Sequence, residues 1–167
     1  MWGKIKDVFR RSSKEPLFTR THDGDTEMQV AYQSAAATFD QLDSFVREGK
    51  VPACCVKLRF KDPVASKKLG EERFLFLWVN IAEADPDDGD AFFGIIFEVP
   101  AELHDWYPPG KYVHFRRADV YDWFVNDQGK LYGGFTLRVQ RSRLPDNQRH
   151  LFDEHTGVRQ WMEHQAW

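Results

Sequence analysis

The chain has only two cysteines, Cys54 and Cys55, and they are neighbours in the sequence. A disulfide between adjacent residues is strained, and two cysteines cannot build a disulfide framework. The two thiols are therefore expected to stay reduced, as is typical of a reducing compartment. If this segment is a strand, the two side chains point to opposite faces.

Long apolar runs are also missing, because no stretch approaches the ~20 residues that cross a bilayer. Residues 1–6 lack the apolar region of a signal peptide. These features predict a cytoplasmic protein without a transmembrane segment. Residues 1–14 combine basic side chains with apolar ones near helical spacing. This pattern leaves two interpretations, a short N-terminal helix or a basic amphipathic helix that contacts an anionic membrane surface.

An excess of positive charge is absent, since the net charge is −3 and the pI is about 6.1. Nucleic acid is held by a basic surface, so it is not expected as a partner. Aromatic residues, in contrast, make up 15% of the chain. Because aromatic side chains bury large areas, this content argues against disorder. A length of 167 residues predicts one domain with a substantial core.

Signatures of catalysis and of cofactor binding are missing as well. The sequence contains neither a Gly-x-Ser-x-Gly nucleophile motif nor a Gly-x-x-x-x-Gly-Lys-Ser/Thr phosphate loop. His150 and His155 are five positions apart, so on a helix they diverge by about 140° and cannot converge on zinc. We therefore expect no cofactor and no metal ion.

The clearest helix is expected over residues 27–48. Thr26 is placed to cap its start, with Gln29 three residues later as in a capping box. Gly49 is a typical helix stop. Apolar side chains recur with helical spacing at Met28, Ala31, Ala35, Phe39, Leu42, Phe45 and Val46.

Antiparallel strands are expected after this helix. Residues 56–60 alternate apolar and basic side chains, which predicts one buried and one solvated face. Residues 74–79 and 92–97 are continuous apolar runs, typical of strands covered on both faces. Residues 112–117 are expected to form a further short strand.

The C-terminal part indicates a helical turn, a hairpin and a last helix. Residues 120–124 have the apolar spacing of one helical turn. Residues 126–129 predict a hairpin turn into a strand over 131–139, in which Gly133-Gly134 indicates a bulge or a close backbone approach. A helix is expected from Pro145 to Gly157.

Together these elements predict an α+β fold, in which an N-terminal helix packs on a curled antiparallel sheet of about five strands, with a C-terminal helical arm. The predicted organisation is a basic leader over residues 1–25, a single α+β domain over 26–141 and a helical extension over 142–167. The expected core contains Phe39, Leu42, Phe76, Trp78, Phe97 and Leu137.

Several short motifs follow one another in a distinctive order. They are Trp78-Val79, Phe93-Gly94, Pro100, Gly110, Asp122-Trp123 and the Gly-Gly-Phe-Thr-Leu-Arg run of residues 133–138. Over residues 28–141 this order resembles the YegJ-like bacterial domain of unknown function. The resemblance implies a helix ahead of a small curled antiparallel sheet, and no settled biochemical activity. It also implies a setting near secreted-toxin and immunity genes.

Four residues form a first candidate site, namely Asp122, Trp123, Thr136 and Arg138. An aspartate and an arginine close in space could hold a polar ligand, with the tryptophan as a platform. The alternative is a structural pair, in which Arg138 and Asp122 fix the hairpin against the preceding helical turn. In either case the Gly-Gly pair at 133–134 would let the Trp123 indole or a backbone approach closely.

An acidic connector between the two apolar runs forms a second candidate site. It contains Asp85, Asp87, Asp88 and Asp90. Calcium is not expected there, because Gly89 comes too early for an EF-hand loop. The connector is either a solvated loop or a negatively charged surface for a basic partner.

These patterns favour a non-enzymatic protein-binding module whose partner is another protein. The more specific form that the resemblance suggests is an immunity protein that neutralises a cognate toxin, with a basic toxin domain as partner. The alternative is a small-ligand-binding or enzymatic domain whose polar site lies around Asp122 and Arg138.

Overall fold

A computed structural model of the chain describes residues 25–51 and 53–163. The helices are α2 (Thr26–Ala37), α3 (Phe39–Glu48), α4 (Pro63–Leu69), α5 (Phe135–Ser142) and α6 (Asp146–Thr156), with 3-10 turns η1 (Ala101–Leu103) and η2 (Arg117–Asp119). The strands are β1 (Cys54–Lys61), β2 (Phe74–Ala84), β3 (Ala91–Ile96), β4 (Tyr112–Arg116), β5 (Val120–Asp127), β6 (Lys130–Gly133) and β7 (Gln160–Trp161). The expectations for residues 1–14 lie outside the described residues.

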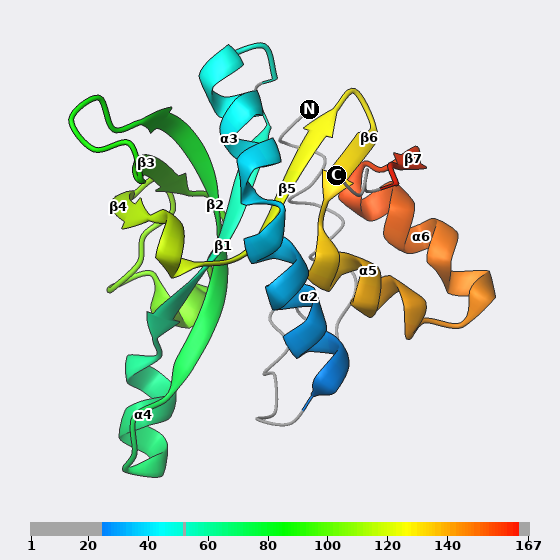
Figure 1. Cartoon of the computed structure of the whole chain (residues 1–167). Coiled ribbons are helices and arrows are strands. Elements are labelled where there is room, and N and C mark those ends of the chain that lie inside the picture. The colour runs from blue at the N-terminus through cyan, green and yellow to red at the C-terminus, as the bar shows by residue number, and fades with distance from the viewer. Residues whose placement is uncertain (1–24, 52, 164–167) are drawn as a thin grey trace.

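The described strands form one sheet in the order β4-β3-β2-β1-β5-β6-β7. Every neighbouring pair is antiparallel except β6 and β7, which are parallel. The predicted α+β class with a mostly antiparallel sheet is confirmed. The sheet is not curled, however, and it has seven strands where about five were expected (Figure 1). The additional strands come from residues 120–127 and from the short C-terminal β7.

The predicted helix over residues 27–48 is present but is divided at Thr38 into α2 and α3. The indole N–H of Trp123 donates to the carbonyl of Ala35 (3.1 Å) and to the Thr38 hydroxyl (3.2 Å). The Ala35 carbonyl would otherwise accept the next helical hydrogen bond, so this contact explains the break. The start also differs from expectation, because Asp25 rather than Thr26 caps the helix through the N–H of Met28.

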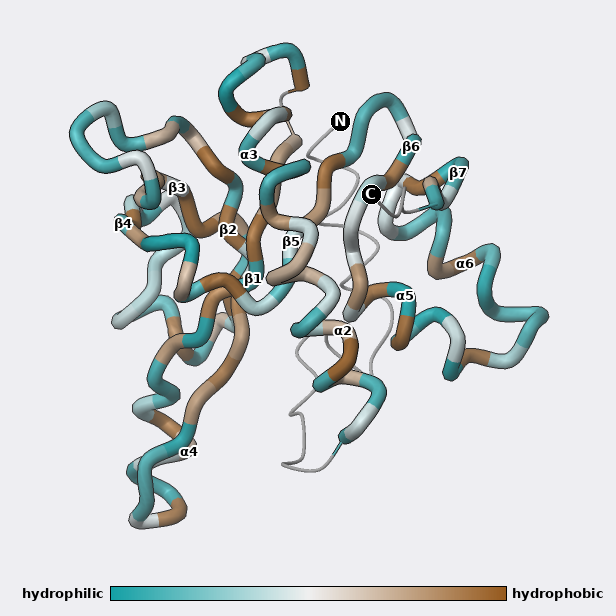
Figure 2. The backbone as a smooth tube through the Cα atoms, in the orientation of Figure 1, coloured by the Kyte–Doolittle hydropathy of each residue, from teal (hydrophilic) through white to brown (hydrophobic). Residues whose placement is uncertain are grey.

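The main core lies between the sheet and helices α2 and α3, which cross one of its faces (Figure 1). The opposite face carries a smaller apolar cluster near α5 and α6, built around Cys55, Trp78 and Leu131. Of the six expected core residues, four are buried and two, Phe76 and Phe97, are only partly buried. The hydropathy along the backbone follows this division, with hydrophobic strands at the centre and hydrophilic loops at the rim (Figure 2).

Two predictions for the C-terminal part were wrong. Residues 120–124 belong to strand β5 rather than to a helical turn. Residues 135–142 form helix α5 rather than a continued strand. The cause is the Gly133-Gly134 pair, whose φ angles of +68° and +66° turn the chain out of the sheet. The predicted hairpin at 126–129 and the helix that ends at Gly157 are confirmed.

No helix in the described part of the chain is both long enough and apolar enough to cross a membrane.

Candidate functional site

Lys57 on β1 and Asp122 on β5 lie directly opposite each other in the sheet. Thr136, from the first turn of α5, completes a group that we call the polar cluster. Only 5% of Lys57 is exposed, and Asp122 and Thr136 are fully buried. The two strands and the helix therefore bring three polar side chains together inside the protein.

Asp122 accepts four hydrogen bonds. Its Oδ1 accepts from the main-chain N–H groups of Trp123 (2.8 Å) and Phe135 (3.2 Å). Its Oδ2 accepts from both the N–H (2.8 Å) and the hydroxyl (2.5 Å) of Thr136. The first N–H groups of a helix have no partner within the helix, and Gly134 at the N-cap has no side chain to supply one. Asp122 therefore caps α5 from the neighbouring strand, with its negative charge at the positive end of the helix dipole.

The Lys57 ammonium reaches Asp122 through Thr136. Its Nζ donates a hydrogen bond to Thr136 Oγ1 at 2.8 Å, and the Thr136 hydroxyl donates its own hydrogen bond to the Asp122 carboxylate. Nζ also lies 5.2 Å from the centre of the Trp78 ring and 5.9 Å from that of Phe76. The charge is thus held by one hydroxyl and two aromatic faces.

Burial shifts the pKa of both charged members of the polar cluster. It lowers the pKa of Lys57 to about 8, against the opposing attraction of Asp122. Burial raises the pKa of Asp122, whereas Lys57 and the hydrogen bonds act in the opposite direction. The four donors that point at the carboxylate therefore offset part of the effect of burial on the pKa of Asp122.

Trp123 points to the other face of the sheet and is fully buried in the main core. Gly133 lies directly against it, because a Cβ atom added at Gly133 would be 2.7 Å from the Trp123 ring atom Cε3. The expected close approach at the glycine pair is therefore confirmed for Gly133. Trp123 contributes packing and the α2–α3 break, and it does not face the polar cluster.

Arg138 does not form the expected direct pair with Asp122. No salt bridge between them is present among the described residues, and the charge of Asp122 only offsets in part the burial that lowers the pKa of Arg138. The guanidinium donates instead to the carbonyls of Gly133 (2.8 Å) and Met162 (2.6 Å), and it lies 5.3 Å from the centre of the Trp161 ring. Arg138 therefore links α5 to β7 and the residue that follows it. The reason is the helical conformation of 135–142, which directs this side chain toward β6 and β7 rather than into direct contact with Asp122.

Lys57 is the member of the polar cluster that sequence reasoning missed. The alternation over residues 56–60 predicted a solvated face for it, but α5 covers that face at this position. The apolar residues Val56 and Leu58 on either side of Lys57 point to the opposite face of β1, so they gave no local signal that this lysine is buried. Its partner Thr136 is 79 positions away, so the pairing itself had no local signature.

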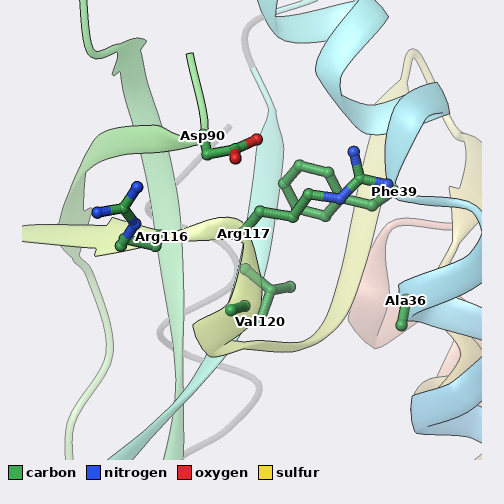
Figure 3. Close-up of a pocket in the computed structure, with 7 residues that line it drawn as sticks. Ala36, Phe39, Asp90, Arg116, Arg117 and Val120 are labelled. Atoms are coloured by element: carbon green, nitrogen blue, oxygen red, sulfur yellow. The ribbon is translucent and has the colours of Figure 1, made fainter. Parts of the chain in front are cut away.

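One hollow of the described surface lies away from the polar cluster. It has a volume of about 340 Å³ and is lined by residues of α2, α3, η2 and neighbouring loops, including Phe39, Asp90, Arg116 and Arg117 (Figure 3). Arg117 pairs with Asp40 at 2.6 Å and Arg116 with an aspartate of the acidic connector at 2.9 Å. Since the positive charges of both guanidinium groups are already compensated, this hollow is poorly suited to bind an anion.

A second hollow, of about 220 Å³, lies between α4 and η1. We call it the α4–η1 hollow. Its lining includes the apolar residues Val64, Leu69 and Leu103 and the charged residues Lys68 and Glu102. Val64 is 39% and Leu69 51% exposed. Exposed apolar side chains beside charged ones are typical of a protein-binding surface.

The acidic connector is only partly free to attract a partner. Asp85 contacts His114 at 2.8 Å and accepts the N–H of Asp87, which lowers the pKa of Asp85. Asp88 accepts the N–H of Asp90 and pairs with Arg116. Asp87 and Asp90 themselves are exposed. The loop is thus both a folded turn and an acidic surface, with two carboxylates engaged internally.

Within residues 25–51 and 53–163, no group of three or more His, Cys, Asp or Glu side chains is placed to hold a metal ion. Cys54 and Cys55 are free thiols, and both are buried. Burial raises the pKa of Cys54 to about 11, so neither position offers a ready thiolate.

The chain belongs to a family described as an uncharacterized protein conserved in bacteria (DUF2314), which matches residues 25–159. The match begins at the Asp25 cap and continues through α6, beyond the stretch in which the YegJ-like resemblance was noted. The narrower YegJ-like assignment stays a prediction. No curated protein and no solved structure matches the chain.

Proposed function

We propose that this chain is a non-enzymatic protein-binding module, in the form of a cytoplasmic immunity protein that covers a basic toxin domain. The observation that carries the proposal is the α4–η1 hollow, where Val64 and Leu69 are exposed in a lining that also contains Leu103. Trp106, just beyond η1, is also 45% exposed. Exposed apolar groups that gather in one place beside charged ones are typical of protein contacts.

The burial of the polar cluster counts against the alternative, a small-ligand or enzymatic site. Asp122 and Thr136 have no exposed surface, and each already has its partners within the protein. Neither hollow described above is lined by them. A catalytic group has to reach its substrate within hydrogen-bonding distance, which this burial prevents.

The acidic connector supplies the charge that suits a basic partner. Asp87 and Asp90 are exposed, and they add to the field of Glu83 close by. Charges of this kind act mainly on the rate of encounter and less on the final affinity. We assign the connector to steering and the α4–η1 hollow to the contact itself.

The test uses the purified chain and the purified product of the gene next to its own. We expect binding that saturates in biolayer interferometry, and protection of cells in which the neighbouring product is toxic. Leu69→Ser should weaken binding at least tenfold, because an apolar contact is removed from a surface position. Leu151→Ser is the matched control, since Leu151 is 55% exposed on α6, away from the hollow.

A second set of variants tests the acidic connector. Replacing Asp85, Asp87, Asp88 and Asp90 by Asn keeps the local hydrogen-bond acceptors and removes the charge. We expect a slower association rate at low salt and a flatter salt dependence, with a melting temperature lowered only slightly by the loss of the surface pairs of Asp85 and Asp88. Absence of binding and of protection by the wild type would refute the proposed function. Equal effects of Leu69→Ser and Leu151→Ser would refute the assigned surface.

A further inference from the structure

Strand β4 is one edge of the sheet, and its outer side faces away from every other described strand (Figure 1). It is five residues long, Tyr112–Arg116, and contains no proline. Tyr112 is 67% exposed, more than any other large hydrophobic side chain in the described part of the chain. An open edge with free N–H and C=O groups is a template for another strand.

The hydrogen bonds to β3 show which main-chain groups of this edge are free. Lys111 accepts from Ile96 at 3.0 Å, and Arg117 donates to Asp90 at 2.8 Å. Because hydrogen-bonded positions alternate along an antiparallel pair, the odd-numbered residues of β4 face β3. The N–H and C=O groups of the even-numbered residues 112, 114 and 116 therefore point outward.

One end of this edge is already closed. The outward N–H of Arg116 donates to the Asp119 carboxylate at 2.9 Å. Tyr112 and His114 are therefore the two residues whose outward N–H and C=O groups are both free. A strand that docks here can therefore form full hydrogen-bonded pairs at these two positions.

We propose that a second copy of this chain occupies the edge, so that two β4 strands pair antiparallel about a two-fold axis at Val113. In this register Tyr112 lies opposite His114 of the other copy, and His114 lies opposite Tyr112. Each of the two pairs forms two N–H to C=O hydrogen bonds, so all four free groups of each edge are used. The two sheets join into one continuous sheet across the dimer.

The neighbouring side chains and charges suit this two-fold arrangement. The Tyr112 ring comes beside the His114 ring of the other copy, which already packs on Phe93 with 4.7 Å between ring centres. In this register Lys111 comes near Arg116 and Arg117 of the other copy, and the charges of these arginines are already compensated within their own chain by Asp88 and Asp40. This self-complementarity favours a second copy over an unrelated strand.

A register centred one residue later, at His114, fits less well. It places Tyr112 opposite Arg116, whose N–H is held by Asp119. The Tyr112 carbonyl would then have no donor. Only the register with its two-fold axis at Val113 gives every free N–H and C=O group of Tyr112 and His114 a partner.

The first experiment measures the molecular mass of the full-length chain by sedimentation from low to high micromolar concentration. We expect a reversible monomer–dimer equilibrium. Tyr112→Pro removes the outward N–H together with the ring and should weaken the dimer at least tenfold, because proline is tolerated at an edge but cannot donate. Tyr112→Thr keeps the N–H and should retain most of the dimer. The proposal of a β4–β4 dimer is overturned by a monomer at every concentration, or by a dimer that Tyr112→Pro leaves unchanged.

The second experiment tests the register by single-cysteine cross-linking. At the two-fold axis the two Val113 residues form a non-hydrogen-bonded pair with Cα atoms about 4.5 Å apart, which suits a disulfide. Val113→Cys should therefore cross-link under mild oxidation, whereas Tyr112→Cys and His114→Cys, about 7–8 Å from their own copies, should not. The native thiols are buried and do not interfere. Cross-linking of His114→Cys with none at Val113→Cys would overturn the proposed axis. Because neither experiment uses a toxin, their outcome is independent of the proposed function.

Discussion

Asp122→Asn is the most informative single change in this protein, because it keeps the shape of the side chain and alters only its charge and donors. The carboxylate accepts from the three N–H groups of Trp123, Phe135 and Thr136 and from the Thr136 hydroxyl. An amide has one oxygen and one NH2 group. Whichever way it turns, its NH2 group meets at least one buried N–H donor.

The expected loss follows from these contacts. A buried donor left without an acceptor costs about 1–3 kcal/mol. Removing one partner of a buried ion pair lowers the free energy of unfolding by roughly 3–5 kcal/mol. Here the removal leaves the Lys57 ammonium without its counter-charge. Since the two terms describe overlapping contacts, we expect a total of about 3–5 kcal/mol, and a melting temperature lower by roughly 6–20 °C for a chain of this size.

The assay is urea unfolding at neutral pH, followed by tryptophan fluorescence. Asp127→Asn is the matched control, because Asp127 lies on the same strand and is partly exposed. It should change the free energy of unfolding by no more than about 0.5 kcal/mol. A loss below about 1 kcal/mol for Asp122→Asn would refute the argument that Asp122 caps α5 and balances Lys57.

Three further changes test other parts of the structure. Burial holds the pKa of Lys57 at about 8 instead of 10.5, so between these pH values the unfolded chain binds more protons and the contribution of Lys57 to stability rises with pH. The stability of the wild type relative to Lys57→Met should therefore grow by up to about 3 kcal/mol across this window, and a constant difference in urea titrations would contradict this. Gly133→Ala should lower the free energy of unfolding by several kcal/mol more than Gly49→Ala. The reason is that both glycines have a positive φ but only Gly133 lies against Trp123. Equal melting temperatures of the two variants would contradict this explanation. Leu42→Ala should cost about 2–5 kcal/mol in calorimetry, since Leu42 is fully buried in the main core, and a change below 1 kcal/mol would contradict its place there.

The parts of the fold with a clear local pattern could be predicted from the sequence. Helical spacing located the α2–α3 region, Gly49 marked its end, and apolar runs located β2 and β3. The division at Thr38 could not be predicted, because its cause is the distant Trp123 indole. A local pattern therefore identifies an element, whereas a tertiary contact sets its exact interruptions.

The errors over residues 120–142 have a common physical origin. Phe135, Leu137 and Val139 have strand-like spacing, and this pattern competes with the two glycines that precede them. The glycine pair turns the chain, and Asp122 then stabilises the new helix by capping it. This cap joins residues 14 positions apart, so a local sequence pattern does not reveal it. Of the four residues grouped from the sequence, Asp122 and Thr136 are in direct contact, and Trp123 contributes only its main-chain N–H. Lys57, rather than Arg138, is the cation that Thr136 links to Asp122.

The Lys57–Asp122 pair also has a consequence for how the sheet assembles. Strands β1 and β5 are far apart in the sequence, so they can meet in more than one alignment while the chain folds. A shift of one residue would reverse the faces of β1, carrying the Lys57 ammonium into the apolar layer beside Leu77 and Val79 and separating it from Thr136. Such an alignment would bury an uncompensated charge, so misaligned sheets are strongly disfavoured. The polar cluster thus favours the native register of β1 and β5 over shifted registers. Without it, the chain should still collapse, but β1 and β5 should pair in the native register less selectively.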